Sequence, residues 1–227
     1  MLKFYYNTGP NPMKVALLLE EAGLPYEGVP VDGRKGDQHK PDYLAINPNA
    51  KAPSLVDGDA VIFDSNAILL YLAEKSGKFL GGKSPAERGA LLSWLMFIAT
   101  GVGPYSGQSV HFQHHAPEKL AYAINRYRFE AKRHYGILNA RLADRPYILG
   151  DAYSIVDMAA WGWARLLHVV LDAEAWGDLP HLKRLVDEIS ARPAASRALA
   201  LAASHTFKAD MDEEARRNMF PSNLVKA

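Results

Sequence analysis

The sequence feature that most constrains the fold is the stretch from Asn47 to Lys75, NPNAKAPSLVDGDAVIFDSNAILLYLAEK. It predicts a strand entered through Ala52-Pro53, a turn, a second short strand, and a helix that opens at Asp64-Ser65. Side-chain oxygens at a helix start satisfy free backbone N–H groups, and the positive end of the helix dipole attracts carboxylates. Unpaired backbone beside Pro53 can hold an extended ligand by strand-type pairing. The stretch therefore predicts a site for a small acidic peptide.

Cysteine is absent from the 227 residues, which excludes a disulfide framework, a thiolate zinc site and a cysteine nucleophile. Any thiol chemistry must use a sulfur that the ligand brings. A formal net charge of +1 gives no reason to expect nucleic acid or an anionic membrane as a partner. The N-terminus lacks a basic flank followed by an apolar core, and no apolar run is long enough to span a membrane, so we expect a cytoplasmic protein.

The N-terminal part alternates strand and helix signals. Residues 2–6 read as a strand, and a helix is expected with Asn11 as its N-cap, Pro12 at its first position and its end near Gly23. A second strand over 26–31 completes a βαβ unit, followed by an exposed polar loop over 32–41 and a short helix over 42–46. Together with the stretch described above, this order predicts a thioredoxin-like α/β domain over residues 1–78.

The remaining residues show helical periodicity with no strand-like alternation. The Gly-, Ser- and Lys-rich segment 76–85 reads as a linker, so we expect an all-helical domain over residues 84–227. Its tail from His205 is polar enough to be loosely held. The expected helices cover residues 87–101, 118–142, 154–171, 181–191 and 194–203.

The stretch NPNAKAPSLVDGD…FDSNAILLYLAEK resembles the glutathione-binding half of the cytosolic glutathione transferases. The resemblance implies a cis peptide bond at Ala52-Pro53, a γ-glutamyl grip by Asp64 and Ser65, and a homodimer. It also implies that the ligand backbone and its glycyl end contact three further residues, Gln38, Lys51 and Ala52.

The segment TGPNPMKVALLLEE resembles the nu-class and yeast prion-related branch of that family, in which a Thr and an Asn replace the usual catalytic residue. Asn11 matches the family's Asn, whereas Thr8 stands one residue before the family's Thr. A donor at a helix start stabilises a thiolate, so Asn11 and Thr8 are the predicted catalytic residues. Two alternatives stay open: Asn11 as a helix cap with Thr8 as a turn residue, or Tyr5 or Tyr6 as the thiol activator.

Two further segments resemble nu-class proteins. In AYAINRYRFE the resemblance implies that Arg126 reaches glutathione in the partner subunit, and the alternative is a surface salt bridge. In GQSVHFQHHAP it implies a loop over the second-substrate pocket, lined by Phe112 and His111. The three histidines of HFQHH could bind a metal, but no thiolate and no distant acidic cluster accompany them, so no metal is predicted.

Ser154 and Asp157 have the spacing of a capping box ahead of a helix that carries Trp161 and Trp163. Asp157 could be a catalytic acid, but the capping pattern favours a structural role. In glutathione transferases a similar motif is a folding element of the helical domain.

The resemblance implies a glutathione-dependent disulfide-bond reductase, in which a bound glutathione thiolate attacks a disulfide sulfur through a mixed disulfide. One alternative is a transferase or lyase that acts on an electrophile or aryl ether. A second alternative is a regulatory protein that binds glutathione without catalysis.

Overall fold

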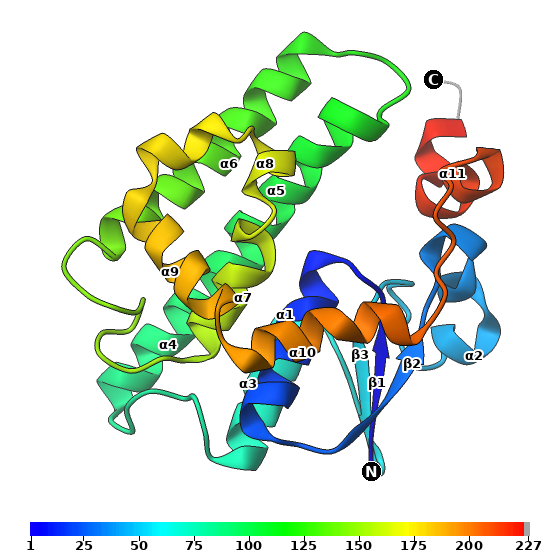
Figure 1. Ribbon diagram of the computed structural model, residues 1–227. Coiled ribbons are helices and arrows are strands. Elements are labelled where there is room, and N and C mark those ends of the chain that lie inside the picture. Colours follow the sequence, from blue (N-terminus) through cyan, green and yellow to red (C-terminus); the bar gives the residue numbers. More distant parts are fainter. Residues whose placement is uncertain (225–227) are drawn as a thin grey trace. The chain divides into compact units, whose positions relative to one another are not determined.

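The computed structural model describes residues 1–224, and its contacts divide the chain into two compact units (Figure 1). The first unit contains residues 1–72 and, of the described C-terminal residues, 193–224, and the second contains Ala73–Arg192. The sequence-based division placed the C-terminal residues in the helical domain, whereas the described part of that segment, 193–224, packs with the first unit.

The first unit is built on a four-stranded sheet in the order β2-β1-β3-β4 (Figure 1). Strand β1 is parallel to β2 and antiparallel to β3, which is antiparallel to β4. This is the predicted thioredoxin-like order. The strands are β1 (Leu2–Tyr6), β2 (Tyr26–Pro30), β3 (Ser54–Asp57) and β4 (Ala60–Phe63), and the helices are α1 (Pro10–Ala22), α2 (Pro41–Leu44) and α3 (Ser65–Ser76).

Helix α1 supplies an apolar face to the core and ends as predicted at Gly23, which has a φ of 68°. Its start differs from the prediction, because Gly9 is the N-cap and the helix begins at Pro10. The side chain of Asn7 accepts a hydrogen bond from the Gly9 amide, which turns the chain before Pro10, and proline fits the first helical position. Asn11 is therefore not the N-cap and lies within the first turn of α1.

The C-terminal segment continues through α10 (Pro193–Ala200), a 3₁₀ turn at Leu201–Ser204, α11 (Glu213–Met219) and a last turn at Pro221–Leu224. Helix α10 packs on α1, and α11 packs on the 3₁₀ turn at Gly33–Lys35. Residues 205–224, which the sequence predicted to be a loosely held tail, make defined contacts with the first unit. The prediction of an exposed loop over 32–41 was wrong in part, because Asp32 and Gln38 are buried.

The second unit begins with one long helical run instead of a helix followed by a loop. It comprises α4 (Pro85–Phe97), a π-helical turn (Ile98–Val102), α5 (Gly103–Val110) and a second π-helical turn (His111–His115). The loop predicted around His111 is thus helical. Pro104 has no backbone N–H to donate, and it lies in the first turn of α5, just after the π-helical turn.

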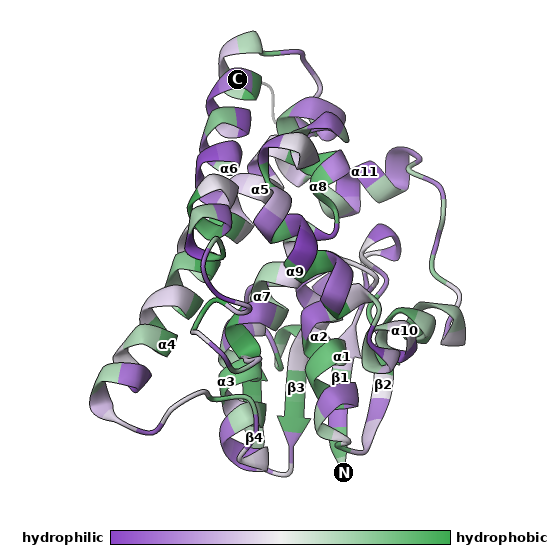
Figure 2. Ribbon diagram, turned by 60° about the vertical axis from the view of Figure 1, so that its left-hand side comes forward, coloured by the Kyte–Doolittle hydropathy of each residue, from purple (hydrophilic) through white to green (hydrophobic). Residues whose placement is uncertain are grey.

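The other helices of the second unit surround its apolar core. Figure 2 distinguishes the hydrophobic residues of α9 from its hydrophilic ones. The helix predicted over 154–171 is interrupted at Leu166, whose φ and ψ of −104° and 20° leave the helical region. The elements are α6 (Ala121–Arg141), α7 (Ile155–Ala164), α8 (Leu167–Val170), a 3₁₀ segment (Glu174–Asp178) and α9 (Pro180–Ser190).

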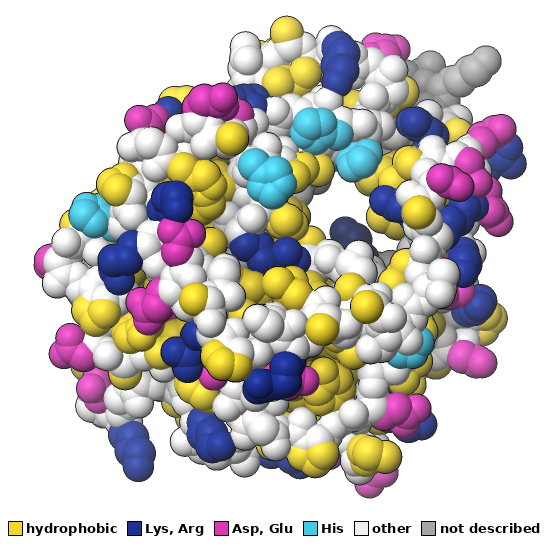
Figure 3. Space-filling view, in the orientation of Figure 1, with side chains coloured by type: hydrophobic (Ala, Val, Ile, Leu, Met, Phe, Trp, Pro, Cys, Tyr) yellow, Lys and Arg dark blue, Asp and Glu magenta, His cyan; other side chains and the backbone are white. Residues whose placement is uncertain are grey.

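Within residues 1–224, no helix combines the length and the apolar character that crossing a bilayer requires. On the face shown in Figure 3, Lys and Arg side chains are interspersed with Asp and Glu side chains. This mixing agrees with the nearly neutral formal charge of the whole sequence.

Candidate active site

The register of the sheet brings the predicted ligand-binding segments of the first unit to one edge. Tyr5 pairs with Ser54, and Ser54 pairs with Phe63, so β1 and β4 end where β3 begins. Strand β2 ends at the same edge because it is parallel to β1. The segment after β1 carries Thr8 and Asn11, the segment after β2 carries Gln38, and the segment after β4 carries Asp64 and Ser65. Ala52 lies just before β3, separated from it by Pro53.

The Ala52-Pro53 peptide bond is cis, as the resemblance implied. The carbonyl oxygen of Lys51 accepts hydrogen bonds from Tyr43 Oη at 2.8 Å and Asn47 Nδ2 at 2.6 Å, which fixes the chain just before Ala52. Within the described residues, neither the N–H nor the C=O of Ala52 has a hydrogen-bond partner. This backbone is available to pair with an extended ligand, and the Lys51 side chain is exposed beside it.

Asp64 caps helix α3 from an unusual backbone conformation with a φ of 70°. Its Oδ1 accepts hydrogen bonds from the backbone N–H groups of Asn66 at 2.8 Å and Ala67 at 3.2 Å. Its Oδ2 makes no hydrogen bond within the described part of the chain, so it can accept one from a ligand ammonium group. Ser65 is buried at the first position of the helix, where backbone N–H groups attract a carboxylate.

Lys14 is a charged residue of this region that the sequence reasoning missed. Its side chain is 1% exposed, and Nζ donates a hydrogen bond to Asn66 Oδ1 at 3.0 Å. Burial lowers the pKa of Lys14 to about 7, although the negative charge of Asp64 opposes this shift. The lysine therefore links α1 to the first turn of α3. The sequence did contain a signal for this buried charge, because Lys14 stands on the otherwise apolar face of the helix predicted to follow Asn11.

The burial of Lys14 predicts how stability depends on pH. Lys14 loses its proton near pH 7 in the folded state but near its ordinary value of 10.5 in the unfolded chain. Between these values the unfolded state binds more protons, so this lysine makes the free energy of unfolding rise with pH. We expect the wild type to gain about 2 kcal/mol over Lys14→Met between pH 7 and pH 9.

Urea unfolding of both proteins at several pH values measures this difference. Lys3→Met, which removes an exposed lysine from β1, is the matched control and should follow the wild type. An identical pH dependence of wild type and Lys14→Met would show that the ammonium of Lys14 is not destabilised by burial.

The predicted catalytic residues differ in their surroundings. Thr8 is exposed and makes no hydrogen bond within residues 1–224, whereas Asn11 is partly buried in the first turn of α1. Tyr6 is fully buried, and its hydroxyl contacts the Leu201 carbonyl oxygen at 2.9 Å and His205 Nδ1 at 2.6 Å. Burial also raises the pKa of Tyr6. Tyr6 therefore does not fit the role of thiol activator.

Gln38 is buried, and its side-chain amide is already engaged. Nε2 donates to the carbonyl oxygens of Gly33 at 3.2 Å and Asn218 at 2.9 Å. Oε1 is buried without a hydrogen-bond partner among the described residues. Contact with Asn218, in the C-terminal tail, was not anticipated from the sequence.

In the second unit, Arg126 forms an ion pair with Glu130 on the next turn of α6, at 2.9 Å, and its side chain is 50% exposed. This is the surface salt bridge that the sequence analysis gave as the alternative role of Arg126. Glu130 also binds Arg133 at 2.9 Å. The ion pair leaves half of the Arg126 side chain accessible to a ligand or to another subunit.

Phe112 and His111 belong to a file of aromatic rings in the second unit. Phe112 stacks on Tyr127 with ring centroids 5.1 Å apart and an angle of 7° between the planes. Tyr105 is 6.3 Å from Tyr127 and 5.0 Å from the ring of His134. The signal for this file was a spacing of seven residues on two helices, from 105 to 112 and from 127 to 134, which places side chains on the same helical face.

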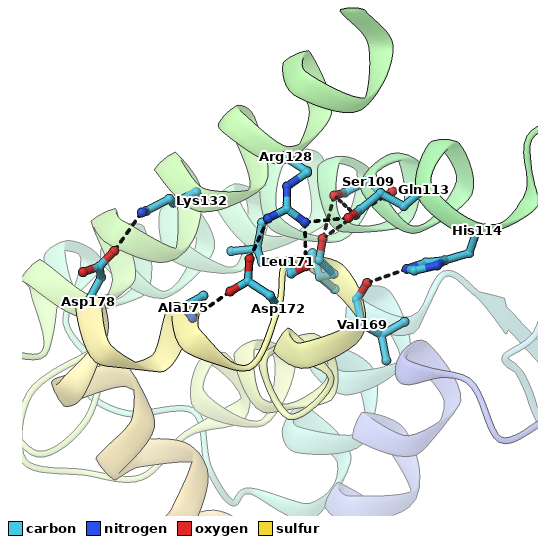
Figure 4. A network of polar contacts seen from close by, with 11 residues as sticks. Ser109, Gln113, His114, Arg128, Lys132, Val169, Leu171, Asp172, Ala175 and Asp178 are labelled. Carbon is cyan, nitrogen blue, oxygen red and sulfur yellow. Dashed lines mark hydrogen bonds and ion pairs between the residues drawn. The ribbon is translucent and has the colours of Figure 1, made fainter. Parts of the chain in front are cut away.

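A polar network fixes the segment that carries these rings (Figure 4). Arg128 on α6 donates hydrogen bonds to Gln113 Oε1 at 2.6 Å, to the Leu171 carbonyl oxygen at 2.6 Å and to Asp172 Oδ2 at 2.7 Å. Gln113 Nε2 in turn donates to the Val170 carbonyl oxygen at 2.8 Å. The network therefore ties the second π-helical turn to α6 and to the end of α8.

A cavity of about 280 Å³ lies beside this network, and none of the predicted site residues lines it. Its positively charged side chains are paired, Arg128 with Asp172 and Lys132 with Asp178, both at 2.7 Å. Among its charged lining residues only Glu174 has no ion-pair partner within the described residues, so the cavity offers a ligand no unpaired positive charge. The cavity is lined by Arg128, Phe129, Lys132, Leu171, Asp172, Glu174, Ala175 and Asp178.

His114 Nε2 lies 3.1 Å from the Val169 carbonyl oxygen, a contact that ties this histidine to α8. Across the described residues, no group of three or more His, Asp or Glu side chains is arranged to hold a metal ion.

Burial lowers the pKa of His111, which favours its neutral form in the aromatic file.

Comparison with known proteins identifies the family. Residues 1–74 match the glutathione S-transferase N-terminal domain and residues 121–188 the C-terminal domain. The disulfide-bond oxidoreductase YfcG of Escherichia coli (strain K12) is 42% identical over 207 residues, which cover 88% of this chain and 94% of YfcG. The chain belongs to the glutathione S-transferase family.

Solved structures agree with this assignment. A glutathione transferase from Burkholderia graminis, with two glutathione molecules bound per subunit, has a TM-score of 0.83 and 38% identity, covering 88% of this chain and 87% of that one. Ure2p in complex with glutathione has a TM-score of 0.82 and 28% identity, covering 87% of this chain and 92% of that one. The predicted family, its Ure2p-like branch and the predicted fold are confirmed.

Proposed function

We propose that this protein is a glutathione-dependent disulfide-bond reductase. The observation that carries the proposal is the shared edge of the sheet, where the unpaired Ala52 backbone, the start of α3 and the first turn of α1 occur together. An extended ligand with a charged amino-acid end and a thiol matches these features. The names of YfcG and of the Burkholderia graminis structure support disulfide chemistry and glutathione as the thiol.

Each predicted glutathione-binding residue of the first unit has a role in this proposal. Asp64 Oδ2 accepts hydrogen bonds from the γ-glutamyl ammonium group, and the α3 start at Ser65 receives the γ-glutamyl carboxylate. The Ala52 backbone pairs with the ligand main chain, while Lys51 and Gln38 bind the rest of the ligand. Asn11 donates a hydrogen bond to the thiolate, and this lowers the pKa of the thiol.

The reaction uses only sulfur atoms that the ligands bring, because the chain has no cysteine. A glutathione thiolate attacks one sulfur of the substrate disulfide, the S–S bond breaks, and the leaving thiolate takes up a proton. A second glutathione thiolate then attacks the glutathione sulfur of the mixed disulfide. This step releases the second substrate thiol and glutathione disulfide, so two glutathiones are oxidised for each disulfide that is reduced.

The aromatic file supplies the proposed second-substrate surface, with Phe112 and His111 contacting the substrate. We also propose a cytoplasmic homodimer in which the accessible Arg126 contacts glutathione of the partner subunit. An aromatic surface also suits a flat electrophile, and this observation favours glutathione transfer to such a compound as the second candidate function.

Steady-state reduction of a small synthetic disulfide tests the proposal, with glutathione supplied and its oxidised form recycled by a reductase. Saturable turnover well above the uncatalysed rate is the expected result. If calorimetry shows glutathione binding but no disulfide is reduced, the reductase proposal is wrong and aromatic electrophiles are the substrates to test next.

A further inference from the structure

The C-terminal tail makes its contacts with the turns that follow β2, at the proposed glutathione-binding edge. The Lys208 amide donates a hydrogen bond to the buried Asp32 carboxylate at 2.7 Å. Arg34 Nη1 donates to the carbonyl oxygen of Lys208 at 2.9 Å and also to that of Ala209. Figure 1 shows the tail passing from α10 to α11, which packs on the turn at residues 33–35.

Two glycines permit the close approach of α11. A Cβ atom added at Gly33 would lie 2.8 Å from Met219 Sδ, and one added at Gly36 would lie 3.0 Å from Asn218 Oδ1. Ala215 on α11 is fully buried, and Asn218 Nδ2 donates a hydrogen bond to the Arg34 carbonyl oxygen at 3.0 Å. The tail is thus seated at defined positions on these turns.

The most consequential contact is the hydrogen bond from Gln38 Nε2 to the Asn218 carbonyl oxygen. Nε2 has two hydrogens, and it faces the carbonyl oxygens of Gly33 and Asn218. It also lies 3.2 Å from His39 Nε2, which is itself 3.0 Å from the Asn218 carbonyl oxygen. Both carbonyl oxygens are acceptors, so the amide must present its nitrogen to them. With the tail in place, Gln38 therefore has no hydrogen left to donate to a ligand carboxylate.

The tail is held by polar contacts more than by apolar burial. Its Lys208 forms ion pairs with Asp212 at 2.8 Å and Glu214 at 2.6 Å, both partners being largely exposed and within the tail itself. Met219 is 40% exposed. Because exposed ion pairs stabilise little and few large apolar side chains are buried, ligand binding can displace the tail.

We propose that residues 205–224 form a strap that competes with glutathione for Gln38, and that the strap withdraws when the glycyl end of glutathione binds. This inference rests on the proposed function. The glycyl carboxylate replaces the Asn218 carbonyl oxygen as the acceptor from Gln38 Nε2. Glutathione affinity is then reduced by the fraction of molecules in which the strap is seated.

Two full-length variants release the strap without changing a residue of the proposed site. Ala215→Arg places a long charged side chain where a buried methyl group packs, and Arg34→Ala removes the donors to Lys208 and Ala209. The matched control is Arg217→Ala, since Arg217 lies on the same helix and, among residues 1–224, forms an ion pair with the exposed Glu213 alone. We expect calorimetry to show glutathione binding several-fold to about tenfold tighter in the two variants than in the control.

Hydrogen exchange of the wild type supplies a second measurement. Saturating glutathione should accelerate exchange of the Lys208 amide and of residues 213–219, because the strap leaves its seat. Two results would overturn the strap proposal but not the proposed function. One is slower exchange of these amides in the wild type with glutathione. The other is an unchanged glutathione affinity in both variants while the wild type binds glutathione. If neither the wild type nor any variant binds glutathione, the proposed function fails, and the strap inference with it.

Discussion

Replacing Asn11 by alanine is expected to lower kcat/KM for glutathione-dependent disulfide reduction about 100-fold, the typical loss when a donor to a developing or stabilised anion is removed. Asn11 is not the cap of α1, because Gly9 holds that position. The substitution should therefore leave the helix start intact, and alanine is well tolerated inside a helix. The loss should appear in kcat/KM, measured with the recycling assay, while the unfolding midpoint stays close to that of the wild type.

Two comparisons sharpen this experiment. Asn125→Ala removes an exposed Asn from α6 and should retain wild-type activity. Thr8→Ala should lower kcat/KM tenfold or less, which corresponds to the loss of about one hydrogen bond, because the Thr8 side chain is exposed and outside the helix. Full activity of Asn11→Ala would contradict the proposed stabilisation of the thiolate by this residue.

Replacing Asp157 by alanine is expected to have the largest effect on stability. The carboxylate is fully buried and accepts hydrogen bonds from the Ile148 amide at 2.8 Å, and from the amide and hydroxyl of Ser154, both at 2.9 Å. Burial raises the pKa of Asp157 to about 6, and these hydrogen bonds oppose the shift. Alanine would leave two buried N–H groups unsatisfied, so we expect a loss of about 4 kcal/mol in the free energy of unfolding.

The chain contains a matched control for this prediction. Ser84 and Glu87 form the same reciprocal capping box at the start of α4, but on the exposed surface. Glu87→Ala should cost far less, because water can replace the lost hydrogen bonds. Urea unfolding of both variants measures the difference. Equal losses would mean that the capping geometry, and not burial, determines the contribution of Asp157.

The features that could be predicted from the sequence are those with local signals. The X-Pro step at Ala52, the turn between β3 and β4 and the polar pair at Asp64-Ser65 are all set by neighbouring residues, and the structure places them as expected. The start of α1 was misplaced by two residues because Gly9-Pro10 and Asn11-Pro12 both have the pattern of a helix start. The Asn7 side chain selects the first of them.

The features that could not be predicted depend on contacts between distant residues. Lys14 is buried against Asn66, which lies 52 residues away, and Gln38 binds Asn218, which lies 180 residues away. No local pattern records such partners. Likewise, the segment around Gln113 contains Gly and His, which are weak helix formers, and its helical form is supported by the hydrogen bonds of Arg128 from α6.

The π-helical turn at Ile98–Val102 has a consequence for how relatives of this protein could diverge. Each residue of a helix turns the following side chains by about 100°. Deleting one residue from regular helix would therefore rotate Tyr105 and Phe112 away from Tyr127. The π-helical turn already contains one residue more than a regular turn, so deleting one residue there would restore regular helix and leave both rings facing Tyr127. Relatives could therefore lose a residue at this turn without dismantling the aromatic file.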